Sequence, residues 1–169
     1  MMKRIISIVA CLIIIISFAP NNYVQAKPKS LPKKLKMSYS SGMGAWSTSI
    51  TVNKKGSFSG SYHDSEGGVT YYSSFEGKFT KIKKVASKKY TMKLTNLKFA
   101  KDSSKRFIKD PPGVKKGKVY TLYCPGYNTS KLPDEVKRWF KMIRRGYERD
   151  GKLTKYILCN TKEYIFFFD

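Results

Sequence analysis

The chain has 169 residues, of which 34 are Lys or Arg and 11 are Asp or Glu, giving a formal net charge of +23. A positive field over a whole molecule attracts anionic partners and disfavours cationic ones. Lysine far outnumbers arginine and is spread along the chain. A solvated basic surface is therefore the alternative to a recognition patch.

The amino terminus has the pattern of a secretory signal peptide. Lys3 and Arg4 precede an apolar run over residues 5–18, and Val24-Gln25-Ala26 is a small-residue cleavage pattern. The run is shorter than the ~20 residues that a membrane-spanning helix needs. Residues 1–26 are therefore predicted to be removed, which leaves a secreted protein that is extracellular or associated with the cell wall. The mature chain keeps a large positive charge and suits one domain.

The first part of the mature chain predicts a β-hairpin after a basic lead-in. Residues 27–36 contain two prolines and five lysines and are expected to be flexible, ahead of a single domain over 37–169. A strand is expected over 35–40. The period-two pattern of 46–52 and its return over 57–62, across an Asn-Lys-Lys-Gly turn, predict two paired strands.

A second pair of strands follows. Residues 69–83 alternate between apolar and polar, and Tyr90, Met92 and Leu94 alternate after a basic turn. The apolar positions slip by one residue at Leu97, which predicts a bulge near Asn96. Residues 101–117 contain an Asp-Pro-Pro-Gly stretch and many lysines, and are expected to form a long loop.

The carboxy-terminal part combines one helix with three strands. Strands are predicted over 119–124, 153–160 and 163–168, and the last of these is apolar on both faces and should be buried. Between the first two, apolar residues recur at i, i+3, i+4 and i+7 and end before a glycine. This helical stripe consists of Val136, Trp139, Phe140 and Ile143.

About eight short antiparallel strands with one helix predict a mainly β protein, either a closed barrel or a sandwich. Gly60 and Gly77 lie inside predicted strands and favour the barrel, because glycine is tolerated where a strand bends sharply or approaches a neighbour. An eight-stranded barrel holds either side chains or one small ligand.

Several segments together resemble an uncharacterised family of exported or lipid-anchored proteins of Gram-positive bacteria. The likeness covers most of residues 38–168 and rests on stretches such as SSGMGAWSTSITVNKKGSFSGSYHDSEGG, YTMKLTNLKF and LPDEVKRWF. The resemblance implies a small lipocalin-like barrel, and Gly44-Ala45-Trp46 is similar to the lipocalin G-x-W tripeptide. The resemblance thus implies that the protein is exported and has this fold. It implies no particular activity, because the family has no established one.

His63 is the single histidine of the chain and is followed by Asp64. We interpret this segment as a hairpin connection, with a weak metal or ligand contact at His63 and Asp64 as the alternative. Catalysis is disfavoured, because adjacent residues of a strand point to opposite faces and no partner nucleophile is evident. Without a CxxC motif or a second histidine, neither a metal site nor a cofactor is expected.

Two further features leave alternatives open. Cys124 and Cys159 are either a disulfide of an exported protein or two buried thiols. The polar side of the predicted helix is basic, which makes it either a solvated face or an anion-binding surface. Its candidate binding residues are Arg138, Lys141, Arg144 and Arg145.

These features predict a non-enzymatic secreted binding module of unknown ligand. One hypothesis places a small apolar ligand inside the barrel, with the helix as its lid. The alternative is a basic cell-surface protein that binds anionic wall polymers, lipid head groups of a membrane surface, or extracellular nucleic acid. The two differ in their response to salt, because only surface adhesion of this kind weakens steeply as salt is raised. The sequence indicates no defined protein partner.

Overall fold

The computed structural model describes residues 30–42, 44–142 and 146–169, with the backbone alone for 140–142. The predicted signal peptide and the first residues of the expected lead-in lie outside these ranges. The rest of that lead-in is part of the fold. Leu31 is buried and its N–H donates to the carbonyl of Lys54, at 2.9 Å. The folded domain therefore begins before residue 37, the boundary that the sequence suggested.

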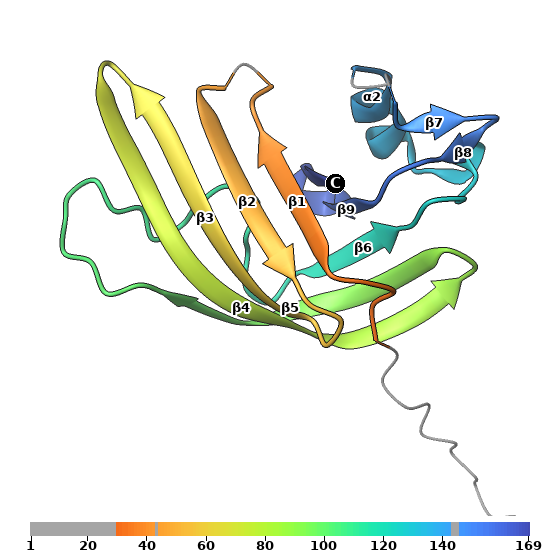
Figure 1. The fold of residues 1–169 in the computed structure, drawn as a ribbon, viewed down its shortest axis with the longest axis horizontal. Coiled ribbons are helices and arrows are strands. Elements are labelled where there is room, and N and C mark those ends of the chain that lie inside the picture. The colour runs from red at the N-terminus through yellow and green to blue at the C-terminus, as the bar shows by residue number, and fades with distance from the viewer. Residues whose placement is uncertain (1–29, 43, 143–145) are drawn as a thin grey trace, which may run out of the picture.

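Eight antiparallel strands close into a barrel in the order β1-β10-β9-β6-β5-β4-β3-β2 (Figure 1). This confirms the predicted mainly β fold with an eight-stranded barrel. The barrel strands are β1 (Leu35–Ser40), β2 (Trp46–Val52), β3 (Ser57–Glu66), β4 (Val69–Ala86), β5 (Lys89–Phe99), β6 (Val119–Tyr123), β9 (Ile157–Asn160) and β10 (Ile165–Phe168). The other elements are helix α2 (Asp134–Met142), the small sheet of β7 (Glu148–Arg149) and β8 (Lys152–Leu153), and the 3-10 turns η1 (Thr129–Lys131) and η2 (Thr161–Glu163).

The predicted hairpin of β2 and β3 is present. The side chain of Asn53 accepts the N–H groups of Lys55 and Ser57, at 2.9 and 3.1 Å, and so fixes the turn. Continuous pairing then runs from Val52–Phe58 to Trp46–Asp64. On β2 the side chains of Thr48, Ile50 and Val52 are buried inside the barrel, as their period-two spacing indicates.

Strands β4 and β5 form a long hairpin that curves along the base of the barrel in Figure 1. Their pairing passes from Lys78–Asn96 to Phe79–Leu94, so Thr95 has no partner in the ladder. This confirms the bulge predicted near Asn96. The extra residue allows apolar side chains on both sides of the bulge to face the interior.

Side chains fill the interior of the barrel. The inward residues of every barrel strand, from Leu35 on β1 to Phe167 on β10, join one apolar cluster, in which Phe79 packs against Phe58 and Tyr120 with ring centroids 5.0 and 5.4 Å apart. Gly77 faces inward beneath the ring of Phe58, and an added Cβ would collide with that ring and with a backbone carbonyl. Close packing of an aromatic ring therefore requires glycine here.

A segment of the long loop after β5 enters the barrel and plugs it. Pro111, Gly113 and Val114 are buried, and Val114 belongs to the interior cluster. Two side chains that point into the barrel form hydrogen bonds with the backbone of this segment. The hydroxyl of Thr48 donates to the carbonyl of Pro112 at 2.6 Å, and that of Tyr120 donates to the carbonyl of Gly113 at 2.9 Å. Part of the loop predicted over 101–117 thus belongs to the core, whereas most of its other residues are exposed or half-buried.

Helix α2 lies outside the barrel and packs on its wall. Val136 of the helix joins a second apolar cluster with the outward side chains of β6, β9 and β10, among them Ile157 and Phe166. Trp139 packs on Phe166 with ring centroids 5.5 Å apart. Trp139 of the predicted apolar stripe thus packs on the barrel wall, and the helix does not form the lid over the barrel that the cavity hypothesis placed there. Phe140 and Ile143 fall outside the described side chains.

The barrel closes at a narrow seam between its first and last strands. A single residue pair, Ser38–Phe168, joins β1 to β10. The last strand is buried on both faces, as predicted, with Phe166 and Phe167 almost inaccessible to solvent. The strand predicted over 153–160 is divided, because residues before the break pair with β7 and those after it join the barrel.

Candidate functional site

The basic residues of β4 and β5 gather on the outer wall of the barrel. The stretch from Gly77 to Lys101 contains nine lysines and no acidic residue. In these strands Ile82, Met92 and Leu94 are buried inside, so Lys83 and Lys93 project outward. Alternation therefore gives these strands an apolar inner face and places Lys83 and Lys93 on the outer face.

Closure of the barrel extends this basic face. Lys93 pairs with Val119 on β6, and Thr121 of β6 pairs with Cys159 on β9, which leads directly into η2. An open pocket of about 420 Å³ lies between the start of β6 and η2, with Lys118 and Lys162 among its lining residues. We define the lysine wall as Lys83, Lys89, Lys93, Lys115, Lys118 and Lys162.

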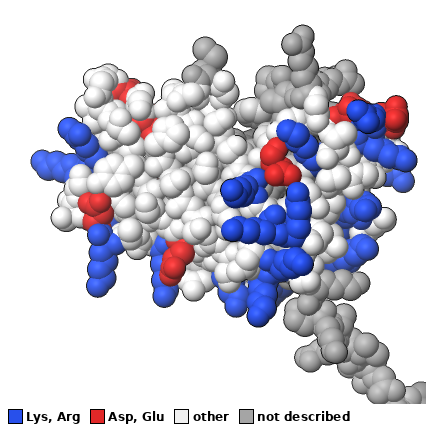
Figure 2. Space-filling view, in the orientation of Figure 1, with Lys and Arg blue, Asp and Glu red and all other residues white. Residues whose placement is uncertain are grey.

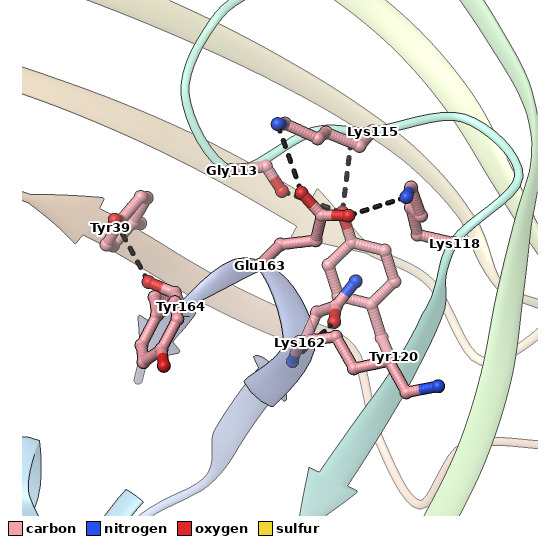
Figure 3. A network of polar contacts seen from close by, with 9 residues as sticks. Tyr39, Gly113, Lys115, Lys118, Tyr120, Lys162, Glu163 and Tyr164 are labelled. Atoms are coloured by element: carbon pink, nitrogen blue, oxygen red, sulfur yellow. Dashed lines mark hydrogen bonds and ion pairs between the residues drawn. The ribbon is translucent and has the colours of Figure 1, made fainter. Parts of the chain in front are cut away.

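One acidic side chain lies within the lysine wall. Glu163 of η2 accepts a hydrogen bond from Nζ of Lys115 at 3.2 Å and forms an ion pair with Lys118 (Figure 3). These two ammonium groups lower the pKa of the Glu163 carboxyl, so it stays ionised at neutral pH. The wall therefore keeps an excess of positive charge, because one carboxylate faces six lysines in total.

The barrel core positions Lys115. The hydroxyl of Tyr120 accepts the backbone N–H of Lys115 at 3.0 Å while donating to Gly113. Burial raises the pKa of Tyr120 to about 12, so the phenol remains protonated and keeps its donor. The same side chain therefore anchors the plug and fixes the backbone of one wall lysine (Figure 3).

Other parts of the surface have a different character. Ser49, Ser61 and Ser74 lie side by side on β2, β3 and β4 and face outward. In Figure 2 the wall over β2 and β3 shows little charge, whereas Lys and Arg gather over the other half of the same view. The positive charge is thus unevenly distributed, which the scattered lysines of the sequence do not reveal.

The basic residues predicted on the helix are only partly described. Arg138 is exposed on α2 and lines a pocket with Trp139, but it is not among the residues that line the pocket of the lysine wall. Lys141, Arg144 and Arg145 lie outside the described side chains. Their role in anion binding stays a prediction.

His63 and Asp64 do not form a shared site. Strand β3 continues to Glu66, and Gly67 and Gly68, both with positive φ, make the turn. The predicted hairpin is present, but Gly67 and Gly68 alone make its turn, and His63 lies within strand β3. Its exposed side chain points outward, whereas the carboxylate of Asp64 accepts the hydroxyl of the inward Tyr62 at 3.0 Å. Within the described residues, no three His, Cys, Asp or Glu side chains are grouped as metal ligands.

Replacing His63 with alanine should change the free energy of unfolding by less than about 0.5 kcal/mol, because the side chain is exposed. Thermal denaturation with and without added Zn²⁺ measures this. A drop in melting temperature of many degrees, or stabilisation by Zn²⁺ in the wild type alone, would instead reveal a site at His63.

The two described cysteines are free and buried. Cys159 pairs with Thr121 and joins the outer cluster, whereas Cys124 joins the interior cluster. Their side chains therefore lie on opposite faces of the wall, and the disulfide left open by the sequence does not form. Burial raises the pKa of the Cys124 thiol to about 11 and that of Cys159 to about 12. Both are protonated at neutral pH and pack as small apolar groups.

Comparison with protein-family models, with curated protein sequences and with solved structures finds no match to this chain. The resemblance to an exported family therefore stays a prediction. No helix among the described residues combines the length and apolar character needed to cross a bilayer.

Proposed function

We propose that this chain is a non-enzymatic, exported binding protein that attaches to linear anionic polymers through its lysine wall. The observation that supports the proposal is a group of six lysines on one side of the barrel, of which only Lys115 and Lys118 are paired with a carboxylate. Lysine ammonium groups act as point charges and bind phosphate without demanding one fixed geometry. They suit a flexible polymer of repeating phosphodiesters.

The filled interior favours this function over binding of a small apolar ligand. Aromatic rings from several strands meet across the barrel, and Val114 of the plug packs among them. A ligand of useful size would have to displace the plug together with its hydrogen bonds to Thr48 and Tyr120. Such displacement costs free energy that an open pocket would not demand.

The partner class that we favour is a phosphodiester polymer of the cell wall, because the predicted signal peptide directs the chain outside the cell. A membrane surface with anionic lipid head groups and extracellular nucleic acid offer the same phosphate chemistry. The proposal assigns no catalytic step and no cofactor.

The salt dependence of binding tests the proposal. For poly(glycerol phosphate), the logarithm of the binding constant should fall linearly with the logarithm of salt concentration, with a slope of about −0.7 for each lysine–phosphate contact. Calorimetric titrations at several salt concentrations give this slope. Anionic vesicles and single-stranded DNA, measured in parallel, identify the preferred source of phosphate. Absence of polyanion binding at low salt, or stoichiometric and salt-independent uptake of an apolar dye, would contradict it.

A further inference from the structure

A second open pocket, of about 380 Å³, lies between α2 and the residue that follows η2. Its lining residues are Glu135, Arg138, Trp139 and Tyr164. The first three stand at i, i+3 and i+4 of the helix and therefore share one side of it. The pocket thus combines two aromatic side chains with a carboxylate and a guanidinium.

Tyr164 has an unusual conformation for its residue type. Its φ of 53° lies in the left-handed region, and 59% of its surface is exposed, the most among the large apolar side chains described. The hydroxyl of Tyr39 donates to its carbonyl at 3.3 Å and helps to hold this backbone in place (Figure 3). Glycine adopts such a conformation with little strain. A strained and exposed tyrosine points to a use for its side chain.

Trp139 provides a rigid part of the same pocket. Its indole packs on Phe166 at a tilt of 38°, which holds the ring in place. Glu135 is half-buried and Arg138 is exposed at the pocket. The carboxylate offers acceptors and the guanidinium a planar fork of donors, both beside an aromatic surface.

We propose that this pocket binds a pyranose ring of a glycan. A pyranose has C–H groups that pack on aromatic rings and hydroxyl groups around its edge that require donors and acceptors. The pocket supplies both kinds of contact. This inference rests on the proposed function and deepens it, because a wall polymer contains sugar rings as well as charged groups.

The position of the pocket agrees with a polymer that reaches both sites. Lys162 and Glu163 of η2 line the pocket of the lysine wall, and Tyr164 follows immediately. The side chains of Glu163 and Tyr164 leave the chain in different directions in Figure 3. A glycan with anionic groups can therefore contact the sugar pocket and the lysine wall on the two sides of η2.

Replacing Tyr164 with glycine tests the proposal. The full mature chain is titrated calorimetrically with uncharged tetrasaccharides of N-acetylglucosamine and of glucose. We expect the wild type to bind at least one of them without dependence on salt, and Tyr164→Gly to bind it about tenfold or more weakly, as the loss of one stacking contact implies. The melting temperature should stay unchanged or rise, because glycine relieves the strain.

Asp150→Gly is the matched control. Asp150 is also a left-handed residue, with a φ of 51°, but it does not line the pocket. The melting temperature of the Asp150→Gly variant should change in the same direction as that of Tyr164→Gly, and the variant should bind the sugar as the wild type does. Failure of the wild type to bind either tetrasaccharide, or equal binding by wild type and Tyr164→Gly, would overturn the proposal. A large loss of stability in Tyr164→Gly would also overturn it, since the side chain would then be structural.

The outcome separates this inference from the proposed function. Salt-dependent binding of poly(glycerol phosphate) without sugar binding would leave the lysine wall and remove the sugar pocket. Sugar binding without binding of poly(glycerol phosphate) would support the sugar pocket and contradict the role of the lysine wall.

Discussion

Neutralising four residues of the lysine wall is expected to weaken binding of poly(glycerol phosphate) about thousandfold at low salt. The substitutions are Lys83→Gln, Lys93→Gln, Lys118→Gln and Lys162→Gln, combined in one variant. Each lysine close to an anionic surface contributes about 1 kcal/mol, and the four together correspond to this change in affinity. The slope of the salt dependence should also become shallower, because fewer counterions are released. Titration over a range of salt concentrations measures both quantities.

A matched variant controls for net charge alone. It replaces four exposed lysines that lie outside the wall, Lys54, Lys101, Lys105 and Lys109, with glutamine. Both variants should keep the melting temperature of the wild type, because the substituted side chains project into solvent or along the surface. If the two variants lose affinity equally, binding depends on overall charge and the lysine wall is not the site.

Replacing Phe79 with alanine is expected to lower the free energy of unfolding by about 3–5 kcal/mol. The ring is 2% exposed and packs between Phe58 and Tyr120. Its removal leaves a cavity in the barrel interior, and the change is a large part of the 5–15 kcal/mol that typically stabilises a domain. Urea denaturation followed by circular dichroism measures the loss.

The same variant tests whether the interior is filled. An apolar fluorescent dye should bind Phe79→Ala more tightly than the wild type, since the substitution opens apolar space. Val85→Ala is the control, because Val85 is 50% exposed and should change neither stability nor dye binding. A small stability loss in Phe79→Ala, combined with strong dye binding by the wild type, would show that the barrel already contains a ligand cavity.

Local patterns predicted the strands well. Alternation placed Thr48, Ile50 and Val52 inside β2, and the slip of the apolar positions at Leu97 located the bulge of β5. Both signals act over a few residues, because side chains in a strand alternate between two faces. The turn between β3 and β4 is shorter than the sequence suggested. Gly67 and Gly68 alone make it, so strand β3 extends through polar residues such as His63.

The plug and the lysine wall were not predictable in this way. Thr48 and the carbonyl of Pro112 are 64 residues apart in sequence, and the plug has no periodic pattern. The wall depends on the pairing of β6 with β5 and β9, which brings Lys118 near Lys93 and Lys162. The alternation of apolar and basic residues around Lys83 and Lys93 could have predicted the part of the wall on β4 and β5. The part that contains Lys118 and Lys162 depends on closure of the barrel, which no local pattern reveals.

The single pair that joins Ser38 to Phe168 has a consequence for how the chain folds. The strands on the two sides of this seam come from opposite ends of the described chain, so the ring is completed only after its last strand has emerged. Bringing such distant residues together costs chain entropy before their contacts provide any stabilisation, which slows folding. A nascent molecule therefore remains an open, curved sheet until β10 docks, and loss of that strand would expose the edges of β1 and β9 together.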